Sequence, residues 1–293
     1  MKTVLIAGGS GLIGKQLQKQ LLIKGYKVYS LTRRAKARGQ IYWDPEKQTF
    51  ESKHLDEVNV IINLAGANIG EKKWTSERKE ELRYSRIQST NYLFLLTKYM
   101  PQLEYYVGAS GVNCYKEDGQ IHAESDAFGP DFLSQLVKDW EEASFSFQQK
   151  CRTAVLRTAV VLTKKGGSMD KMLSPIKIGI GSAIGSGKQH LPWIHVDDIC
   201  NMYIFAIENQ LEGTFNAVAD CTPNKDFMHQ LAKTVKKPFF LPAVPAFVLK
   251  WFLGEMSSLV LSDLQASNDK IKSAGFTFKF PFLDAALENL LIQ

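Results

Sequence analysis

The feature that most restricts the fold of this chain is a glycine-rich turn near its N-terminus. The turn, "GGSGLIGK" (8–15), follows the apolar run "KTVLIAGG" and opens a segment of helical periodicity that ends at Gly25. Its glycines, Gly8, Gly11 and Gly14, allow a tight turn and let the backbone approach a phosphate, while the start of the helix offers free N–H groups. A glycine turn that only packing requires is the other interpretation. We favour a strand–turn–helix unit that binds a dinucleotide.

Strand-like and helix-like segments alternate through the first half of the chain. Apolar runs typical of buried strands recur at 27–34, 59–66, 104–110 and 152–162. Helical periodicity occupies 76–99 and 131–143. This alternation predicts a Rossmann-type α/β fold, a doubly wound parallel sheet covered by helices.

The residue pattern of the sequence changes after about residue 163. Glycine-rich stretches, "KKGGSMDKM" and "GIGSAIGSGKQ", surround a short segment, and the remainder is typical of a smaller α/β lobe. We therefore expect a nucleotide-binding Rossmann domain at 1–163, to which later segments return. A substrate-side C-terminal lobe is expected at 164–293.

The residues at the end of the second predicted strand indicate which dinucleotide binds. Sites specific for NAD(H) place Asp or Glu there to bind the ribose 2′-hydroxyl. This chain has Thr32, Arg33 and Arg34 instead. A guanidinium matches a 2′-phosphate in charge and in fork geometry, so the sequence predicts NADP(H). Arginines that are merely solvated are the alternative.

Charge and cysteine usage bound the class of partner and the compartment. The net charge is +6, with a basic cluster at 33–38, which fits either a solvated surface or attraction for a phosphorylated ligand. The sequence carries no recognised nucleic-acid motif, so no nucleic-acid partner is expected. No apolar run approaches the length of a membrane span, and four scattered cysteines form no C-x-x-C pair. We expect a cytoplasmic protein without a membrane segment, a disulfide framework or a metal site.

Several longer motifs carry a family resemblance. They are "INLAGANIGEKKWTSERKEELRYSRIQST" (62–90), "GAS" (108–110), "FLSQLVKDWE" (132–141), "LPWIHVDDI" (191–199) and "GFTFKFPFLDAAL" (275–287). With the glycine turn, they make the chain similar to the extended short-chain dehydrogenase/reductases. More narrowly, it resembles an uncharacterised epimerase-like subfamily that ends in a small C-terminal domain of its own. The resemblance covers essentially the whole chain and implies NAD(P)-dependent oxidoreductase or epimerase chemistry.

The resemblance also implies which residues contact the cofactor. The pyrophosphate would lie along the glycine turn, the adenosine phosphate would face the two arginines, and the last four positions would lie near the nicotinamide ribose. The matching positions are Gly8, Ser10, Gly11, Leu12, Ile13, Gly14, Arg33, Arg34, Leu64, Ala65, Gly66, Arg86, Ala109, Ser110, Thr158 and Ala159. Arg86 stands where relatives commonly have Asn. Plain core packing is the alternative role of Leu64, Ala65 and Ala109.

The proton-transfer pair of the resembled enzymes is missing. Those enzymes use Tyr-x-x-x-Lys on the helix expected at 131–143, where the tyrosine exchanges the substrate proton and the lysine lowers its pKa. Aligned by Glu141, the two positions are Leu133 and Val137. Neither side chain can transfer a proton.

Other residues are candidates to replace that pair. A register shifted by one residue gives Ser134 and Lys138, an i, i+4 pair that is turned about 100° from the apolar face. Tyr115, in "GASGVNCYK", is a candidate acid, with a packed loop aromatic as its alternative role. His195, in "WIHVDD", is the second candidate, and a structural histidine near a helix cap is its alternative.

The expected substrate is an anionic small molecule, because six basic side chains come from segments near the C-terminal edge of the sheet, where open parallel sheets bind ligands. These are Arg78, Arg83, Arg86, Arg157, Lys188 and His190. The favoured function is an NADP(H)-dependent oxidoreductase or epimerase with atypical acid and base residues. A non-catalytic NADP(H)-binding sensor or regulatory module is the alternative, and a nucleic-acid or scaffold protein is a third. The sequence predicts neither the identity of the substrate nor the oligomeric state.

Overall fold

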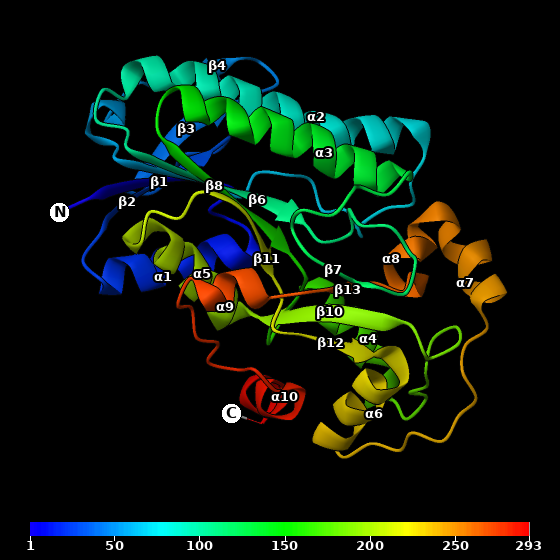
Figure 1. Ribbon diagram of the computed structural model, residues 1–293. Helices are drawn as coiled ribbons and strands as arrows, with labels where there is room; N and C mark the ends of the chain where they lie inside the picture. The colour runs from blue at the N-terminus through cyan, green and yellow to red at the C-terminus, as the bar shows by residue number, and fades with distance from the viewer. Residues whose placement is uncertain (293) are drawn as a thin grey trace.

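A single eight-stranded sheet organises the computed structural model, which describes residues 1–292 (Figure 1). Its strand order is β11-β8-β6-β5-β1-β2-β3-β4, and neighbours run parallel except for β3 and β4 at one edge. The strands are β1 (Thr3–Ala7), β2 (Lys27–Thr32), β3 (Gln40–Asp44), β4 (Thr49–Phe50), β5 (Val60–Asn63), β6 (Tyr105–Gly111), β8 (Arg152–Thr158) and β11 (Gly213–Ala217). The chain winds outward from β1 in one direction and then from β5 in the other, so the predicted Rossmann-type sheet is confirmed.

Helices cover both faces of this sheet. Two of them pack together on one face and two on the other (Figure 1). The side chains of β1 alternate accordingly: Val4 and Ile6 join one buried cluster, and Leu5 and Ala7 join the other. Because both faces are covered, β1 is a continuous apolar run. The helices are α1 (Leu12–Ile23) and α5 (Val196–Glu208) on the first face, and α2 (Ser76–Leu95) and α3 (Phe132–Phe145) on the second.

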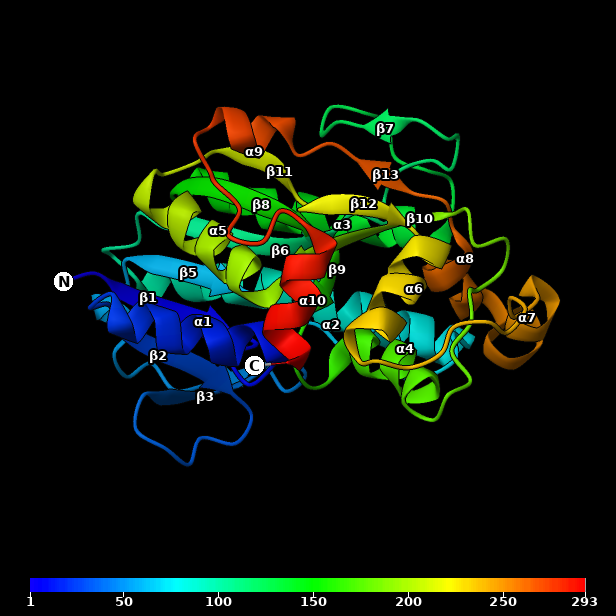
Figure 2. The same cartoon turned by 90° about the horizontal axis from the view of Figure 1, so that it is seen from below.

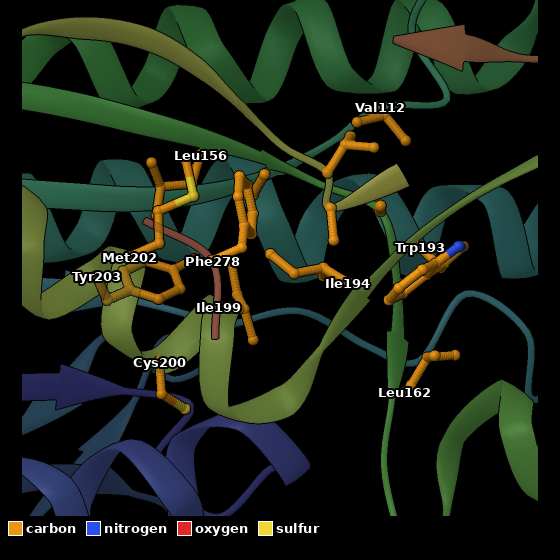
Figure 3. Close-up of a cluster of buried hydrophobic side chains, with 14 of the residues drawn as sticks. Val112, Leu156, Leu162, Trp193, Ile194, Ile199, Cys200, Met202, Tyr203 and Phe278 are labelled. Carbon is orange, nitrogen blue, oxygen red and sulfur yellow. The ribbon is translucent and has the colours of Figure 1, made fainter. Parts of the chain in front are cut away.

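The larger buried cluster joins the sheet, α5 and the C-terminal part of the chain. Met202 and Tyr203 of α5 lie close to Leu156 of β8 and to Phe278, which precedes the last helix (Figure 3). All four side chains are buried. The core is therefore continuous across residue 163, and β11 joins the main sheet beside β8.

The remaining strands form two small sheets, with the orders β12-β10-β9 and β13-β7 (Figure 2). The remaining helices include several that gather at one end of the molecule, beyond the carboxyl ends of the parallel strands (Figures 1 and 2). The small strands are β7 (Ile121–His122), β9 (Val160–Leu162), β10 (His190–His195), β12 (Asp220–Pro223) and β13 (Gln265–Ala266). The helices are α4 (Gly167–Lys177), α6 (Asn224–Thr234), α7 (Ala246–Leu253), α8 (Ser258–Leu261), α9 (Asp269–Ser273) and α10 (Leu283–Leu291), with short 3₁₀ turns η1 (Leu55–Glu57), η2 (Leu96–Tyr99), η3 (Ser146–Gln149) and η4 (Gly254–Ser257).

One strand prediction is wrong in its extent. The apolar run at 152–162 is two strands, because the chain leaves the main sheet at Ala159: β8 pairs with β6 and β11, whereas β9 pairs with β10 in a different sheet. Both parts are apolar and packed, so their residue pattern does not reveal the change of sheet.

Buried acceptors tie the C-terminal segment to the core. The Asp198 carboxylate, at the start of α5, accepts hydrogen bonds from the backbone N–H groups of Lys279 (2.6 Å) and Phe280 (2.9 Å). In contrast, α7 has no buried residue. Among residues 1–292, no helix combines the length and the apolar character that crossing a membrane requires.

Candidate cofactor and substrate site

Of the three regularly spaced glycines in the turn between β1 and α1, two are closely packed. Gly8 has φ +82°, and a Cβ there would lie 2.6 Å from the carbonyl oxygen of Leu64. A Cβ on Gly14 would lie 2.5 Å from the carbonyl oxygen of Gly8. Gly11 is exposed, and a Cβ there would meet only that same oxygen, at 3.3 Å. Packing therefore explains Gly8 and Gly14, while Gly11 is free to face a ligand.

The start of α1 presents unpaired backbone donors at the same edge. Gly11 is the N-cap residue and has no side chain that could cap the helix, and the first turn contains no acidic residue. Ser10 and Leu12 are exposed, and Ile13 is half-buried. The positive end of the helix dipole is therefore available to an anion.

Arg33 and Arg34 follow the last residue of β2, as the sequence predicts. Both side chains are exposed, and neither forms an ion pair within residues 1–292. The Thr32 hydroxyl accepts a hydrogen bond from the backbone N–H of Arg34 at 3.2 Å. The two guanidinium groups are thus free to bind a phosphate.

Arg86 of α2 is a buried cation beside the loop that follows β5. Its guanidinium donates to the carbonyl oxygens of Leu82 (3.2 Å) and Ala67 (3.0 Å) and lies 5.1 Å from the ring centre of Trp140. Burial, together with the nearby charge of Arg78, lowers the pKa of Arg86 to about 10. No carboxylate among residues 1–292 pairs with it, so a bound anion would relieve an uncompensated charge.

The loop after β5 contains three further positions predicted to contact the cofactor. Leu64 is half-buried, Ala65 is buried and Gly66 is exposed. A Cβ on Gly66 would lie 3.2 Å from Cζ of Arg86. The structure therefore brings this loop and Arg86 together.

Ser110, at the carboxyl end of β6, belongs to a buried polar network. Its hydroxyl donates to Oε1 of Glu141 at 2.7 Å. Arg157 of β8 holds the same carboxylate in a fork, with Nε–Oε1 and Nη2–Oε2 distances of 2.8 Å. Ala109, Thr158 and Ala159 lie beside these residues on β6 and at the end of β8. That network was not predicted as a unit, because its members are up to 47 positions apart in the sequence.

Tyr115 is the one predicted proton-transfer residue that lines a cavity, although its side chain is almost fully buried. Its hydroxyl oxygen accepts a hydrogen bond from Nη1 of Arg157 at 2.8 Å and donates to Oδ1 of Asn216 at 2.6 Å. Its ring stacks on His122. Burial raises the pKa of Tyr115, and the charge of Arg157 opposes that effect.

His195 occupies a different place and does not line the cavity that contains Tyr115. Its Nδ1 accepts a hydrogen bond from the backbone N–H of Asp197 at 3.0 Å and so caps α5. Its ring packs against Phe280, and burial lowers its pKa to about 4. This geometry favours the alternative interpretation of His195, a structural histidine at a helix cap, over the catalytic one.

The helix α3 presents apolar side chains at the two positions predicted to correspond to the Tyr–Lys pair. Leu133 is buried and lines the cavity, and Val137 lies beside Gly111. Of the shifted pair, Ser134 is buried and Lys138 is exposed. The two side chains therefore do not act together on one open face.

The cavity beyond the carboxyl ends of the strands has a volume of about 370 Å³. One wall comes from the start of α2 (Trp74, Lys79), and a second comes from the start of α3 (Phe132). The loop after β6 contributes Asn113, and the C-terminal part contributes a wall that includes Ser262. These residues were not predicted from the sequence. The position of Asn113, just after a strand that ends at the ligand-binding edge, could have identified it as a candidate.

The expected arginine-rich cleft is not present in this form, because carboxylates neutralise most of the basic side chains. Arg78 pairs with Glu81 at 2.6 Å, and Arg83 pairs with Asp139 at 2.5 Å. Arg157 pairs with Glu141, and His190 pairs with Asp263 at 2.9 Å. Lys188 is exposed, and neither it nor any of the arginines lines the cavity. Of the four arginines in this set, only the buried Arg86 has no carboxylate partner within residues 1–292.

Comparison with known proteins places this arrangement in a class. Residues 4–217 match the NAD dependent epimerase/dehydratase family, and residues 244–290 match a domain of unknown function, DUF1731. The first match spans more than half of the chain and includes every element that carries the glycine turn, Arg86 and the Ser110 network. The chain therefore belongs to the NAD dependent epimerase/dehydratase family, with the fold of an extended short-chain dehydrogenase/reductase.

Its full-length relatives define the subfamily more closely. An epimerase family protein of Staphylococcus aureus is 33% identical over 99% of both chains, and the epimerase family protein SDR39U1 of Mus musculus is 32% identical over 98% of this chain and 99% of its own. The crystal structure of human SDR39U1 (isoform 2) with NADPH has a TM-score of 0.91 at 31% identity, covering 99% of each chain. A nucleoside-diphosphate sugar epimerase from Corynebacterium glutamicum has a TM-score of 0.81 at 28% identity, covering 99% of this chain and 58% of that one. The predicted identification as an atypical, epimerase-like member with its own C-terminal domain is confirmed.

Proposed function

We propose that this protein binds NADP(H) and acts as an oxidoreductase or epimerase on a small molecule held in the cavity. The observation that carries the choice of cofactor is the pair of exposed arginines without carboxylate partners, Arg33 and Arg34, directly after β2. The NADPH bound by human SDR39U1 supports the same choice. A bound NADP(H) would supply or accept a hydride.

The residues present fit such a cofactor. The glycine turn and the start of α1 would hold the pyrophosphate, because the first N–H groups of the helix lack a side-chain cap and Gly11 leaves room. Arg86 would gain an anionic partner that the protein itself does not provide. Ser110, Thr158 and Ala159 would lie beside the nicotinamide ribose.

Tyr115 is the proposed proton donor. The raised pKa keeps its proton in place at neutral pH, and Arg157 would stabilise the negative charge that remains after the proton leaves. The proton now points to Asn216, so transfer to a ligand requires that hydrogen bond to be exchanged. The proposal does not extend to an anionic substrate, because the basic side chains expected in the cleft are paired.

A non-catalytic NADP(H)-binding module is the second candidate function. The observation that favours it is the complete commitment of the Tyr115 hydroxyl to Arg157 and Asn216, combined with the apolar Leu133 and Val137 on α3. Turnover of NADPH with any member of a panel of ketones, aldehydes and sugar nucleotides would exclude this candidate. The cytoplasmic location also stays a proposal, supported by four cysteines that form no disulfide.

Titrations of NADPH and NADH, followed by fluorescence, test the cofactor proposal. Charge-assisted contacts of two guanidinium groups should make NADPH bind about tenfold to a hundredfold more tightly. Arg33→Ala should weaken NADPH binding and leave NADH binding unchanged. Arg152→Ala is the matched control, since Arg152 is exposed at the opposite end of the parallel strands. Equal or tighter binding of NADH by the unaltered protein would overturn the proposal.

A further inference from the structure

The cavity combines an aromatic wall with an excess of negative charge. We propose that it binds an uncharged aromatic carbonyl compound and disfavours nucleoside diphosphates and other anions. This inference names the substrate class of the proposed function and therefore rests on it. Three independent features of the walls support the inference.

The aromatic wall is formed by Trp74 and Phe132. Their ring centres lie 5.5 Å apart in an edge-to-face arrangement, and both residues line the cavity. The indole N–H of Trp74 donates to the carbonyl oxygen of Ile69 at 2.9 Å, which fixes the orientation of the ring. Leu133 and Leu264 extend the apolar surface. A planar aromatic ligand can pack against such a wall with little loss of rotamer freedom in the protein.

The charged groups of the cavity are mostly acidic. Glu117, Asp131 and Glu255 line it, and Lys79 is its only basic side chain within the described chain. Lys79 is itself paired with Glu255 and lies 5.1 Å from the ring centre of Phe132. An anionic ligand would therefore meet two carboxylates that no basic side chain of the cavity balances. A diphosphate, with two negative charges, would be disfavoured most.

Asn113 supplies a polar group that is free to recognise a carbonyl oxygen. It follows β6, lines the cavity together with Tyr115, and makes no side-chain hydrogen bond within residues 1–292. Most other polar groups of the walls are committed: Asp131 caps α3 by accepting from the N–H of Ser134 at 2.9 Å, and the Ser262 hydroxyl donates to Glu117 at 2.5 Å. The carboxamide N–H₂ of Asn113 can donate to a ligand oxygen without breaking an existing bond.

Three related methyl ketones test this proposal: acetophenone, 4-acetylbenzoate and cyclohexyl methyl ketone. Binding to the full-length protein is measured by ligand-observed NMR, with and without NADPH. Acetophenone should bind at least about tenfold more tightly than 4-acetylbenzoate because of the acidic walls. It should also bind about threefold more tightly than the cyclohexyl ketone because of ring packing. UDP-glucose should not displace it.

Two substitutions connect these preferences to the named residues. Glu117→Gln should raise the affinity for 4-acetylbenzoate about threefold and leave that for acetophenone unchanged. Asn113→Ala should weaken acetophenone binding about threefold to tenfold. Lys138→Ala, an exposed change on α3 away from the cavity, is the control for both.

The outcomes separate this inference from the cofactor proposal. No binding of acetophenone, or equal or tighter binding of 4-acetylbenzoate or UDP-glucose, would overturn the inference while NADPH titrations stay unaffected. Failure to bind NADPH would overturn the proposed function. The ketone series without NADPH would still report the preference of the cavity.

Discussion

At the scale of single residues, the three glycines of the turn have different roles that their spacing does not distinguish. Gly8 and Gly14 are required because other backbone atoms lie where a side chain would begin, whereas Gly11 faces solvent. The spacing therefore predicts a phosphate-binding turn, but only the packing shows which glycine can be replaced without harm to the fold.

Gly11→Val should abolish NADP(H) binding and leave a folded protein, because the new side chain would project into the expected path of the pyrophosphate. Gly14→Val should instead destabilise the fold by about 2 kcal/mol or more, because its Cβ would overlap the backbone of Gly8. Circular dichroism and urea unfolding measure the fold and stability of both variants, and an NADPH titration measures their affinity for the cofactor. Unimpaired binding by Gly11→Val would show that the cofactor does not follow this turn.

His195 predicts a pH dependence of stability. Its pKa is lowered from 6.5 to about 4 in the folded state, so the unfolded chain takes up the proton first as the pH falls. Stability should therefore decrease between pH 6.5 and pH 4, by up to about 1.4 kcal/mol per pH unit from this residue. The charges that act on the ring are those of Asp197, which opposes the shift, and Lys279, which adds to it.

Urea unfolding at pH 7, 6 and 5 measures this dependence. His195→Asn keeps a side-chain oxygen that can cap α5 and removes the titrating group, so its stability should vary less with pH. Identical slopes for the two proteins would contradict a buried, neutral histidine.

At the scale of elements, α3 carries apolar side chains at the two positions predicted to correspond to the Tyr–Lys pair. Leu133 and Val137 are buried there, and Glu141 anchors the helix to β8 through Arg157. Lys138 is exposed and forms no ion pair among the described residues. A proton must then come from outside this helix.

Lys138→Ala should change NADPH affinity by less than about threefold, as for a solvated charge. Tyr115→Phe should lower any measured turnover by about 10²–10⁴-fold, because it removes the proposed acid. It should also cost about 1–3 kcal/mol of stability, because Asn216 and Arg157 lose a buried partner. Turnover is therefore compared under conditions in which thermal unfolding shows both proteins to be folded. A large loss with Lys138→Ala would mean that the shifted pair is the working one.

At the scale of the whole molecule, the C-terminal segment closes the cavity and is held to the Rossmann core by buried polar contacts. Asp198 accepts two backbone hydrogen bonds from 279–280, and Phe280 packs on His195. The same C-terminal part supplies Glu255, Ser262 and Leu264 to the cavity. The C-terminal part therefore both forms a wall of the cavity and packs on the Rossmann core.

Asp198→Ala should destabilise the protein by about 3 kcal/mol, because two buried N–H groups lose a charged acceptor. Asp197→Ala is the control. It removes an ion pair with Lys279 and a hydrogen bond from Gln16, both at the rim of the protein, and should cost less, about 1 kcal/mol. Urea unfolding gives both values, and limited proteolysis should cut Asp198→Ala first near 276–282. Equal effects of the two substitutions would show that Asp198 does not hold this segment.

The sequence alone determined those parts of the fold and of the candidate site that depend on residues close together in the chain. The apolar run of β1, the glycine turn, the helix periodicity and the arginines after β2 are all local patterns, and they predicted the sheet and the location of the nucleotide-binding turn. The short strands β3 and β4 were missed, because patterns of five and two residues are too short to be recognised as strands. The change of sheet at Ala159 was missed because both sides of it are apolar.

Only the tertiary structure decided which basic side chains are paired with a carboxylate and which hydrogen-bond partners the polar side chains of the site have. The pairing of Arg157 with Glu141, the hydrogen bond of Tyr115 to Asn216 and that of Ser262 to Glu117 join residues 16, 101 and 145 positions apart. A basic residue in a sequence has no fixed effect on a cavity, since its charge counts only if no carboxylate lies within ion-pair distance in the folded protein. For that reason the sequence predicted an anionic cleft ligand, whereas the packed walls of the cavity favour an uncharged one.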